Sequence, residues 1–145
     1  MRSKLPFRRQ ETPSSCAVAC LRMILEHHGI VFSEAELRKR CQTSALGTRV
    51  ENLLICARAL GFEAEIEYLT VERLRELLGE GVYPIAYINM FPTSHIPYTH
   101  TVIVESYEGG WLLVVDPLAE PKEIHLPEFL ESWAFYDNMA IILQR

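Results

Sequence analysis

Hydrophobic residues in the first part of the chain recur at helical spacing. Between Ala17 and Leu25 the apolar positions fall mostly three and four residues apart, and Arg22 is the one charged residue among them. This pattern predicts a helix that is buried on most of its circumference and that ends at Gly29. Cys16 stands at its N-terminal tip, behind a turn of N-cap residue types from Thr12 to Ser15.

Two more helices follow this first one. Ser33 opens a segment that continues to about Cys41, and Glu36 stands three residues after the serine, as in a capping box. The next segment, GTRVENLLICARALG, repeats the arrangement with Thr48 and Glu51. The pattern therefore predicts three consecutive helices before the first strand.

The period of the apolar positions changes to two at Phe62. From Phe62 to Tyr68 apolar residues alternate with glutamates, which predicts a strand with one solvent-exposed face. A fourth helix is predicted over Val71–Leu78. The nearly uninterrupted apolar run from Tyr83 to Asn89 then predicts a strand that is buried on both faces. The segment MFPTSHIPYTH behind it, with two prolines, is predicted to be a loop.

A β-hairpin is predicted in the second half of the chain. Strand-like segments cover Thr99–Tyr107 and Trp111–Val115, and the residues Glu-Gly-Gly between them are a strong turn signal. Three shorter elements complete the chain: a strand over Lys122–His125, a helix from Pro127 to about Trp133, and a strand over Met139–Leu143.

The hairpin brings a histidine and an aspartate to the same face of the sheet. If Tyr107 pairs with Trp111, Asp116 stands level with Val102 and diagonal to His100. A slip of two residues would set Asp116 directly opposite His100. Side chains alternate between faces with a period of two, so both registers leave His100 and Asp116 on one face and within reach of each other.

The order of elements predicts the α+β class, with an N-terminal helical part packed on a C-terminal antiparallel sheet. We expect a single domain over residues 1–145. The buried face of the sheet has to cover the apolar first helix, and this packing brings Cys16 at the helix tip against His100 on the sheet.

Composition and charge narrow the class of protein. The 145 residues are 49% hydrophobic, which is typical of a globular fold. The formal net charge of −5 and the lack of a long basic run argue against nucleic acid as the main partner. No apolar stretch reaches membrane-spanning length, and no apolar segment of a secretory signal follows the basic N-terminus. We expect a cytoplasmic protein without membrane insertion.

The four cysteines indicate neither a disulfide framework nor a metal site. Cys16 and Cys20 are four residues apart on one helix, a spacing that does not allow a mutual disulfide. Cys41 and Cys56 lie singly within helical patterns, without the paired spacing of metal ligands. We therefore interpret Cys20, Cys41 and Cys56 as small core residues and expect no metal or cofactor. Cys16 differs because a helix N-terminus lowers the pKa of a thiol.

Four residues together have the chemistry of a cysteine hydrolase. Such an enzyme needs a thiolate and a histidine that holds the thiolate in an ion pair and later protonates the leaving group. It also needs a third group that orients the imidazole. Cys16, His100 and Asp116 supply these three types. The tetrahedral intermediate also needs hydrogen-bond donors, and the backbone N–H of Cys16 and the side-chain amide of Gln10 can supply two, because the turn between them can fold the glutamine back.

Each of these residues also has an ordinary structural interpretation. Gln10 taken alone is a polar residue of an N-terminal arm, His100 a core histidine, and Asp116 before a proline a turn residue. Their combination on one predicted surface favours catalysis. His95, in the loop near the predicted cleft, is a candidate substrate contact.

The sequence resembles the C39 peptidase family from Gln10 to about Trp133. The resemblance rests on Gln10 and Cys16, on ACLRMILEHHG, SEAELRKRC and GTRVENLLICARALGF, on His100 before an apolar strand, and on VVDP at Asp116. It implies a papain-like fold with Cys16 as nucleophile, His100 as general base and acid, Asp116 as its orienting group and Gln10 in the oxyanion hole. Members are best known as N-terminal domains of bacterial ABC transporters that cleave leader peptides after a double glycine.

The leading hypothesis is thus a cysteine endopeptidase that acts on a peptide or protein, with a Gly-Gly leader as candidate substrate. Ser15 and Ala17 replace the Asp and Gly that commonly flank the cysteine in the family. Because the chain has no transmembrane or nucleotide-binding segment, we expect a stand-alone member or an isolated domain, with an ABC transporter encoded separately as the implied partner. The alternatives are a catalytically silent docking domain and a papain-like acyltransferase or amidase.

Overall fold

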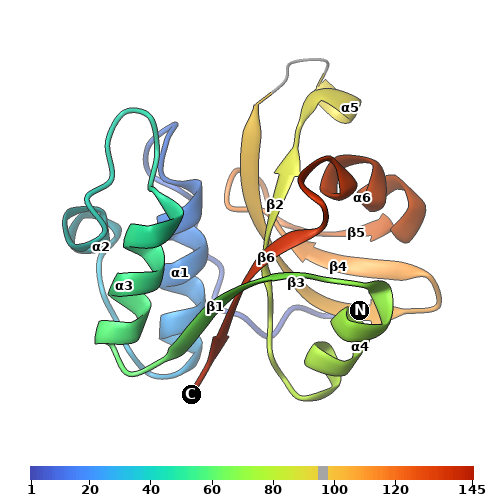
Figure 1. Cartoon of the computed structure of the whole chain (residues 1–145), viewed down its shortest axis with the longest axis horizontal. Helices are drawn as coiled ribbons and strands as arrows, with labels where there is room; N and C mark the ends of the chain where they lie inside the picture. The colour runs from blue at the N-terminus through green and yellow to red at the C-terminus, as the bar shows by residue number, and fades with distance from the viewer. Residues whose placement is uncertain (95–97) are drawn as a thin grey trace.

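A computed structural model describes residues 1–94 and 98–145 of the chain. At its centre lies an antiparallel sheet of six strands in the order β1-β6-β2-β3-β4-β5 (Figure 1). The strands are β1 Glu63–Tyr68, β2 Ile85–Asn89, β3 Thr99–Glu108, β4 Trp111–Val115, β5 Pro121–His125 and β6 Met139–Gln144. The helices are α1 Cys16–His27, α2 Glu34–Arg40, α3 Val50–Ala59, α4 Val71–Gly79, α5 Phe91–Ser94, α6 Leu126–Trp133 and the 3-10 turn η1 Ala134–Tyr136.

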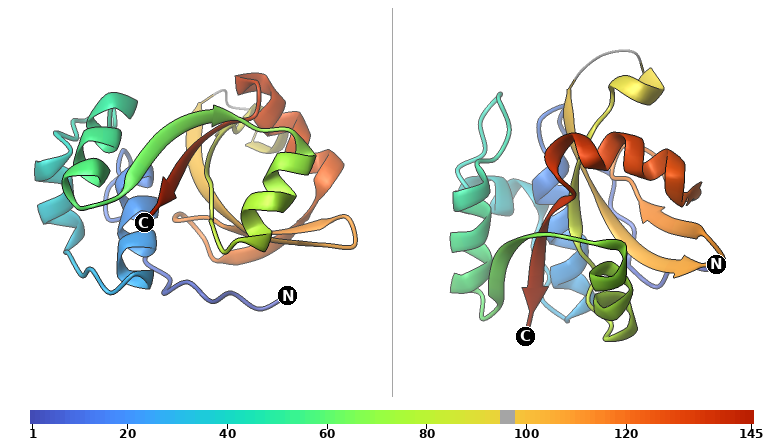
Figure 2. Two further views of the ribbon diagram at one scale, coloured as in Figure 1. Left: turned by 60° about the horizontal axis from the view of Figure 1, so that its bottom comes forward. Right: turned by 45° about the vertical axis from the view of Figure 1, so that its right-hand side comes forward.

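Helices cover both faces of the sheet. α1, α2 and α3 gather on one side, and α4 and α6 lie on the other (Figures 1 and 2). Two buried apolar clusters follow from this arrangement, one around Leu21 and Ile103 between α1 and the sheet, and one around Trp133 on the opposite face. The α+β prediction is confirmed, and α1 is buried along most of its surface, as its apolar pattern predicted.

Side-chain hydroxyls cap the N-termini of α2 and α4. Ser33 caps α2, since its hydroxyl accepts the N–H of Glu36, and Thr70 caps α4 in the same way. The predicted cap of α3 is wrong. Arg49 holds the N-cap position without a side-chain cap, because the hydroxyl of Thr48 pairs with that of Thr43 at 2.7 Å instead.

The predicted single exposed face of β1 is only partly correct. Ala64 is buried, but Ile66 and Tyr68 on the same apolar side are 39% and 64% exposed. Within residues 1–94 and 98–145, β1 is an edge strand that pairs only with β6, and α3 packs against it. Its apolar side therefore loses its cover toward the C-terminal end of the strand.

The segment behind β2 is not entirely a loop. All five residues of β2 are buried, as the apolar run predicted. The short helix α5 follows, and Asn89 holds its start because its Oδ1 accepts the N–H of Phe91 at 2.8 Å. His95, the candidate substrate contact, lies outside the described residues.

The turn of the β3–β4 hairpin differs from the prediction. Glu108, not Tyr107, pairs with Trp111, so the loop consists of Gly109 and Gly110 alone. Both glycines have positive φ angles, 58° and 85°. Two-residue hairpin turns of this kind require positive φ at both positions, which glycine adopts without strain.

A β-bulge at Glu105 corrects the register before the strands reach His100. Ser106 pairs with Leu113, but Val104 pairs with Val114, so Glu105 has no partner of its own on β4. The register beyond the bulge carries Asp116 to the level of Val102, as predicted. Without the bulge, Asp116 would stand level with Ile103, and its side chain would point to the other face of the sheet from His100.

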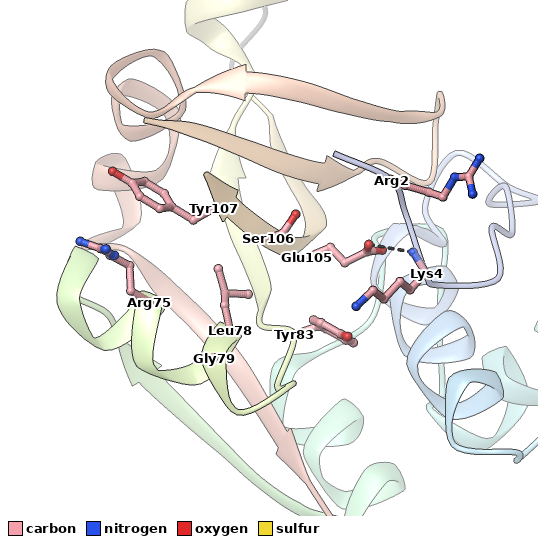
Figure 3. Close-up of a pocket in the computed structure, with 9 residues that line it drawn as sticks. All are labelled: Arg2, Lys4, Arg75, Leu78, Gly79, Tyr83, Glu105, Ser106 and Tyr107. Atoms are coloured by element: carbon pink, nitrogen blue, oxygen red, sulfur yellow. Dashed lines mark hydrogen bonds between the residues drawn. The ribbon is translucent and has the colours of Figure 1, made fainter. Parts of the chain in front are cut away.

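The bulge also binds the N-terminal arm, residues 1–10, which runs toward α1 (Figure 2). The buried Glu105 carboxylate accepts hydrogen bonds from the Ser3 hydroxyl at 2.7 Å and from the backbone N–H groups of Lys4 and Leu5 at 2.8 and 3.3 Å. Figure 3 shows Glu105 pointing from β3 toward the arm, beside a cavity of about 390 Å³. None of the four predicted site residues lines this cavity.

Candidate active site

Hydrogen bonds between Thr12 and Ser15 hold the turn before α1. The Ser15 hydroxyl donates to the Thr12 carbonyl oxygen and accepts the Thr12 N–H, both at 3.0 Å. Ser15 therefore occupies the N-cap position, but its side chain does not cap the helix. Cys16 begins α1, where the first backbone N–H groups have no acceptor within the helix and favour an anion.

His100 and Asp116 are in direct contact at the end of the sheet. The Nε2 atom of His100 lies 2.7 Å from Oδ1 of Asp116, and both side chains are buried. The same Oδ1 accepts the N–H of Leu118 at 2.8 Å, and the ammonium of Lys122 lies 3.9 Å from Oδ2. Because Asp116 engages one ring nitrogen, the other, Nδ1, is left for the thiol.

Cys16 meets the start of β3 at two neighbouring residues. The side chain of His100 and the side chain and backbone of Thr101 are the polar groups that act on the thiol and stabilise its charged form. Burial raises the pKa of Cys16, but these polar groups and the charge of His100 outweigh it, so the pKa lies below its ordinary value.

The imidazole is shifted in the opposite direction. Burial lowers the pKa of His100, yet hydrogen bonds and charge attraction from Asp116 and Cys16 raise it to about 9. Burial raises the pKa of Asp116, but its bonds to His100 and Leu118 and the charge of Lys122 bring it below its ordinary value. The lowered pKa of the thiol and the raised pKa of the imidazole both favour a thiolate–imidazolium pair.

Gln10 lies at the end of the N-terminal arm and is 8% exposed. Its backbone N–H donates to the carbonyl oxygen of Pro117 at 2.8 Å, which ties it to the residue after Asp116. Its side-chain Nε2 donates to the carbonyl oxygen of Thr12 at 2.8 Å, and one N–H of the amide remains for another acceptor. The role of Gln10 in an oxyanion hole stays a prediction.

The structure thus brings Cys16, His100 and Asp116 together. A backbone hydrogen bond joins Gln10 to Pro117, the residue after Asp116. Sequence reasoning missed Thr101, the second contact of the Cys16 sulfur on β3. The available signal was that Thr101, which carries a hydroxyl group, directly follows the candidate histidine His100 in the sequence. The reasoning also missed Glu34, a fully buried carboxylate of α2 that contacts the residue after Gln10.

The other three cysteines have the core positions that the sequence predicted. All four cysteines are free, and Cys20, Cys41 and Cys56 are buried, as expected of core residues. Over residues 1–94 and 98–145, no group of three His, Cys, Asp or Glu side chains is arranged to hold a metal ion. None of the helices in this part of the chain has the length and apolar character needed to cross a membrane.

Comparison with known sequences finds one matching family and several related transport proteins. The sequence model described as the peptidase C39 family matches residues 4–145. The pediocin PA-1 transport/processing ATP-binding protein PedD of Pediococcus acidilactici is 26% identical over 138 residues, which are 94% of this chain and 18% of that protein. The lactococcin-G-processing and transport ATP-binding protein LagD of Lactococcus lactis is 27% identical over 124 residues, or 86% of this chain and 17% of that protein. The chain thus spans less than a fifth of the length of these relatives.

Solved structures share the fold. A double glycine motif protease from an AMS/PCAT transporter, determined in complex with the leader peptide, superposes with a TM-score of 0.78 and 25% identity, covering 98% of this chain and 92% of that one. The peptidase domain of Streptococcus ComA, a bi-functional ABC transporter, superposes with a TM-score of 0.74 and 20% identity, covering 94% and 95%.

Proposed function

Because this chain belongs to the peptidase C39 family, we propose that it is a cysteine endopeptidase that uses Cys16, His100 and Asp116 as its catalytic residues and Gln10 as an oxyanion donor. The observation that carries the proposal is the series of contacts from the Cys16 thiol through His100 to Asp116. The pKa of the thiol is lowered and that of the imidazole is raised along this series.

The first half of the reaction forms a thioester. The Cys16 thiolate attacks the carbonyl carbon of the scissile peptide bond, and the carbonyl oxygen becomes an oxyanion. The backbone N–H of Cys16 and the free N–H of the Gln10 side chain donate to this oxyanion. His100 then gives its proton to the leaving amine, the C–N bond breaks, and the acyl group remains on the sulfur.

The second half returns the enzyme to its starting state. His100, now neutral, takes a proton from a water molecule whose oxygen attacks the thioester carbon. A second oxyanion forms at the same position and collapses, the C–S bond breaks, and a carboxylic acid leaves. Asp116 holds the imidazole ring in one orientation and stabilises its positive charge through both steps.

We infer that the substrate is a peptide with a leader that ends in Gly-Gly and that the partner is an ABC transporter. The C39 membership supports this inference. So do the relatives named for bacteriocin processing and transport and the similar structure of a double glycine motif protease with its leader peptide.

Incubation with synthetic leader peptides tests the proposal. The chain is mixed at pH 7 with peptides that carry Gly-Gly between a leader and a short cargo, and mass spectrometry identifies the products. We expect cleavage after the second glycine and none with Cys16→Ala. Cys20→Ala is the matched control, because Cys20 lies one turn further along α1 and is fully buried, so this variant should cleave like the wild type.

The products separate the alternatives. No cleavage across a broad peptide panel would contradict the endopeptidase, and cleavage only at other sequences would contradict the Gly-Gly substrate. Products joined to an added amine instead of water would indicate an acyltransferase. A Cys16→Ala variant that still binds leader peptide, beside a wild type that binds but never cleaves, would indicate a silent docking domain.

A further inference from the structure

Gln10 and the two residues after it, Glu11 and Thr12, are held by three different parts of the fold. The N–H of Gln10 donates to Pro117 after β4, and the N–H of Thr12 donates to Ser15 at the tip of α1. Between them, the N–H of Glu11 donates to both carboxylate oxygens of Glu34 on α2, at 3.0 and 3.2 Å. Three successive backbone amides thus have three separate anchors.

The anchor on α2 differs from the other two because it is a charged side chain with no exposed surface. Glu34 also forms an ion pair with Arg38 at 3.2 Å. Arg38 and Arg22 in turn lie 3.6 and 3.5 Å from the carboxylate of Glu11. A hydrogen bond to a buried carboxylate is about twice as strong as one between neutral groups. Loss of this contact therefore costs more free energy than loss of either of the other two.

The peptide group that Glu34 binds is the one that joins Gln10 to Glu11. Its orientation is described by the ψ angle of Gln10, so the bond to Glu34 fixes one of the two backbone torsions at the Cα atom that carries the Gln10 side chain. The Gln10 side chain then has only one further fixed point in the described residues, the bond from Nε2 to the Thr12 carbonyl oxygen at 2.8 Å. A loose peptide group at Glu11 would leave the amide free to turn away.

We propose that Glu34 is a positioning residue of the oxyanion hole: its carboxylate fixes the Gln10–Glu11 peptide group and through it the direction of the Gln10 amide. The inference rests on the proposed function, because it takes Gln10 as an oxyanion donor. It adds that this donor is set from α2, a helix that carries none of the proposed catalytic residues.

The test compares two reactions of Cys16 that differ in their need for an oxyanion hole. Acylation by p-nitrophenyl acetate passes through a tetrahedral oxyanion and releases p-nitrophenolate. Alkylation by iodoacetamide displaces iodide at a carbon and forms no oxyanion. We expect Glu34→Ala to lower the acylation rate by roughly 10- to 100-fold, less than the 10²–10³ for complete loss of a donor. The alkylation rate and its pH profile should not change.

Three further variants complete the test. Glu34→Gln keeps an acceptor for the Glu11 N–H, so it should recover part of the acylation rate and serves if the alanine variant does not fold. Glu36→Ala removes an exposed carboxylate from the same turn of α2, where it pairs with Arg40, and should react like the wild type in both assays. In a Gln10→Ala background, Glu34→Ala should cause no additional loss of acylation.

Three results would overturn the inference: unchanged acylation in Glu34→Ala, an equal fall in alkylation, or an undiminished additional loss in the Gln10→Ala background. The ester needs no leader sequence, which separates this test from that of the proposed substrate. A wild type that is acylated but cleaves no peptide would contradict only the endopeptidase. A wild type that is not acylated would contradict both proposals.

Discussion

Two cysteines one turn apart on α1 have opposite chemistry. Cys16 and Cys20 both contact Thr101, and Cys20 lies with its sulfur 3.6 Å from the Thr101 carbonyl oxygen. The pKa of the Cys16 thiol is lowered, whereas complete burial and the charge of Cys16 raise the pKa of the Cys20 thiol well above its ordinary value. Residue type and helix are the same and Thr101 is a shared neighbour, so the difference in pKa has to come from the place of each cysteine on the helix and from its other neighbours.

Position differs in two respects. Cys16 is the first residue of α1, where unpaired N–H groups favour an anion, while Cys20 lies inside the helix. Cys16 also contacts His100, whereas Cys20 has the two acceptor atoms of Thr101 and no cation. The comparison teaches that a single helical turn separates a reactive thiol from a core residue when a histidine meets only the tip.

Removal of His100 should erase most of this difference. Without the imidazole, burial dominates at Cys16 as it does at Cys20, so the pKa of Cys16 rises. We expect His100→Ala to lower kcat on a leader peptide by about 10³-fold, within the range for loss of a general acid–base group. Alkylation of Cys16 at pH 7 should fall as well. His125→Ala, at the exposed end of β5, is the control, and unchanged alkylation in His100→Ala would contradict the ion pair.

Removal of the charge behind the histidine should have a smaller effect. We expect kcat/KM to rise with pH as Cys16 loses its proton and to fall near pH 9 as His100 loses its own, since the pKa of His100 is raised to about 9. Asp116→Asn removes the strongest cause of that increase. The falling limb should therefore move to lower pH. At pH 10, on that limb, a fall of one to two units in the pKa of His100 should lower the rate by roughly ten- to a hundredfold, at about tenfold per pKa unit.

The measurement is the pH dependence of kcat/KM for both proteins. Glu123→Gln is the matched control, because this carboxylate is exposed on β5, lines the same pocket as Asp116 and should leave the falling limb at its place. A falling limb that stays near pH 9 in Asp116→Asn would mean that Asp116 does not set the pKa of His100.

The smallest expected effect comes from the contact that the two cysteines share. Thr101→Val keeps the shape of the side chain and removes the hydroxyl, which lies 3.8 Å from the sulfur of Cys20 and also binds Cys16. We expect alkylation of Cys16 to slow by less than tenfold, because His100 and the backbone of Thr101 remain. The free energy of unfolding should fall by about 1 kcal/mol.

Cys20 should stay unreactive toward iodoacetamide in the folded Thr101→Val variant. Thr99→Val is the control, since the hydroxyl of Thr99 contacts Tyr136 and neither cysteine. Faster alkylation of Cys16 in Thr101→Val would contradict the assigned contact.

Periodicity alone was sufficient for most of the fold. The apolar spacing predicted α1, and the uninterrupted apolar run predicted the buried β2, because both patterns report burial directly. The single domain over residues 1–145 stays a prediction. The exposure of Ile66 and Tyr68 was not predictable, since a strand pattern does not say whether the strand lies at the edge of the sheet.

The site was predictable in its residue types and less so in its local contacts. Helix-tip polarity pointed to Cys16, and strand parity pointed to His100 and Asp116. Hydrogen-bond choices were not accessible: Ser15 binds Thr12 and leaves the helix uncapped, because a serine hydroxyl has several backbone partners within reach. Glu34 could not be found either, since its contact with Glu11 depends on how α2 packs against the arm.

The bulge at Glu105 separates the register at the turn end of the hairpin from the register at the His100 end. β3 holds one residue more than β4 can pair, so a chain without Glu105 could still set Val104 against Val114 and keep Asp116 level with Val102. The turn end of this hairpin can therefore lose one residue while the end that carries His100 and Asp116 keeps its register.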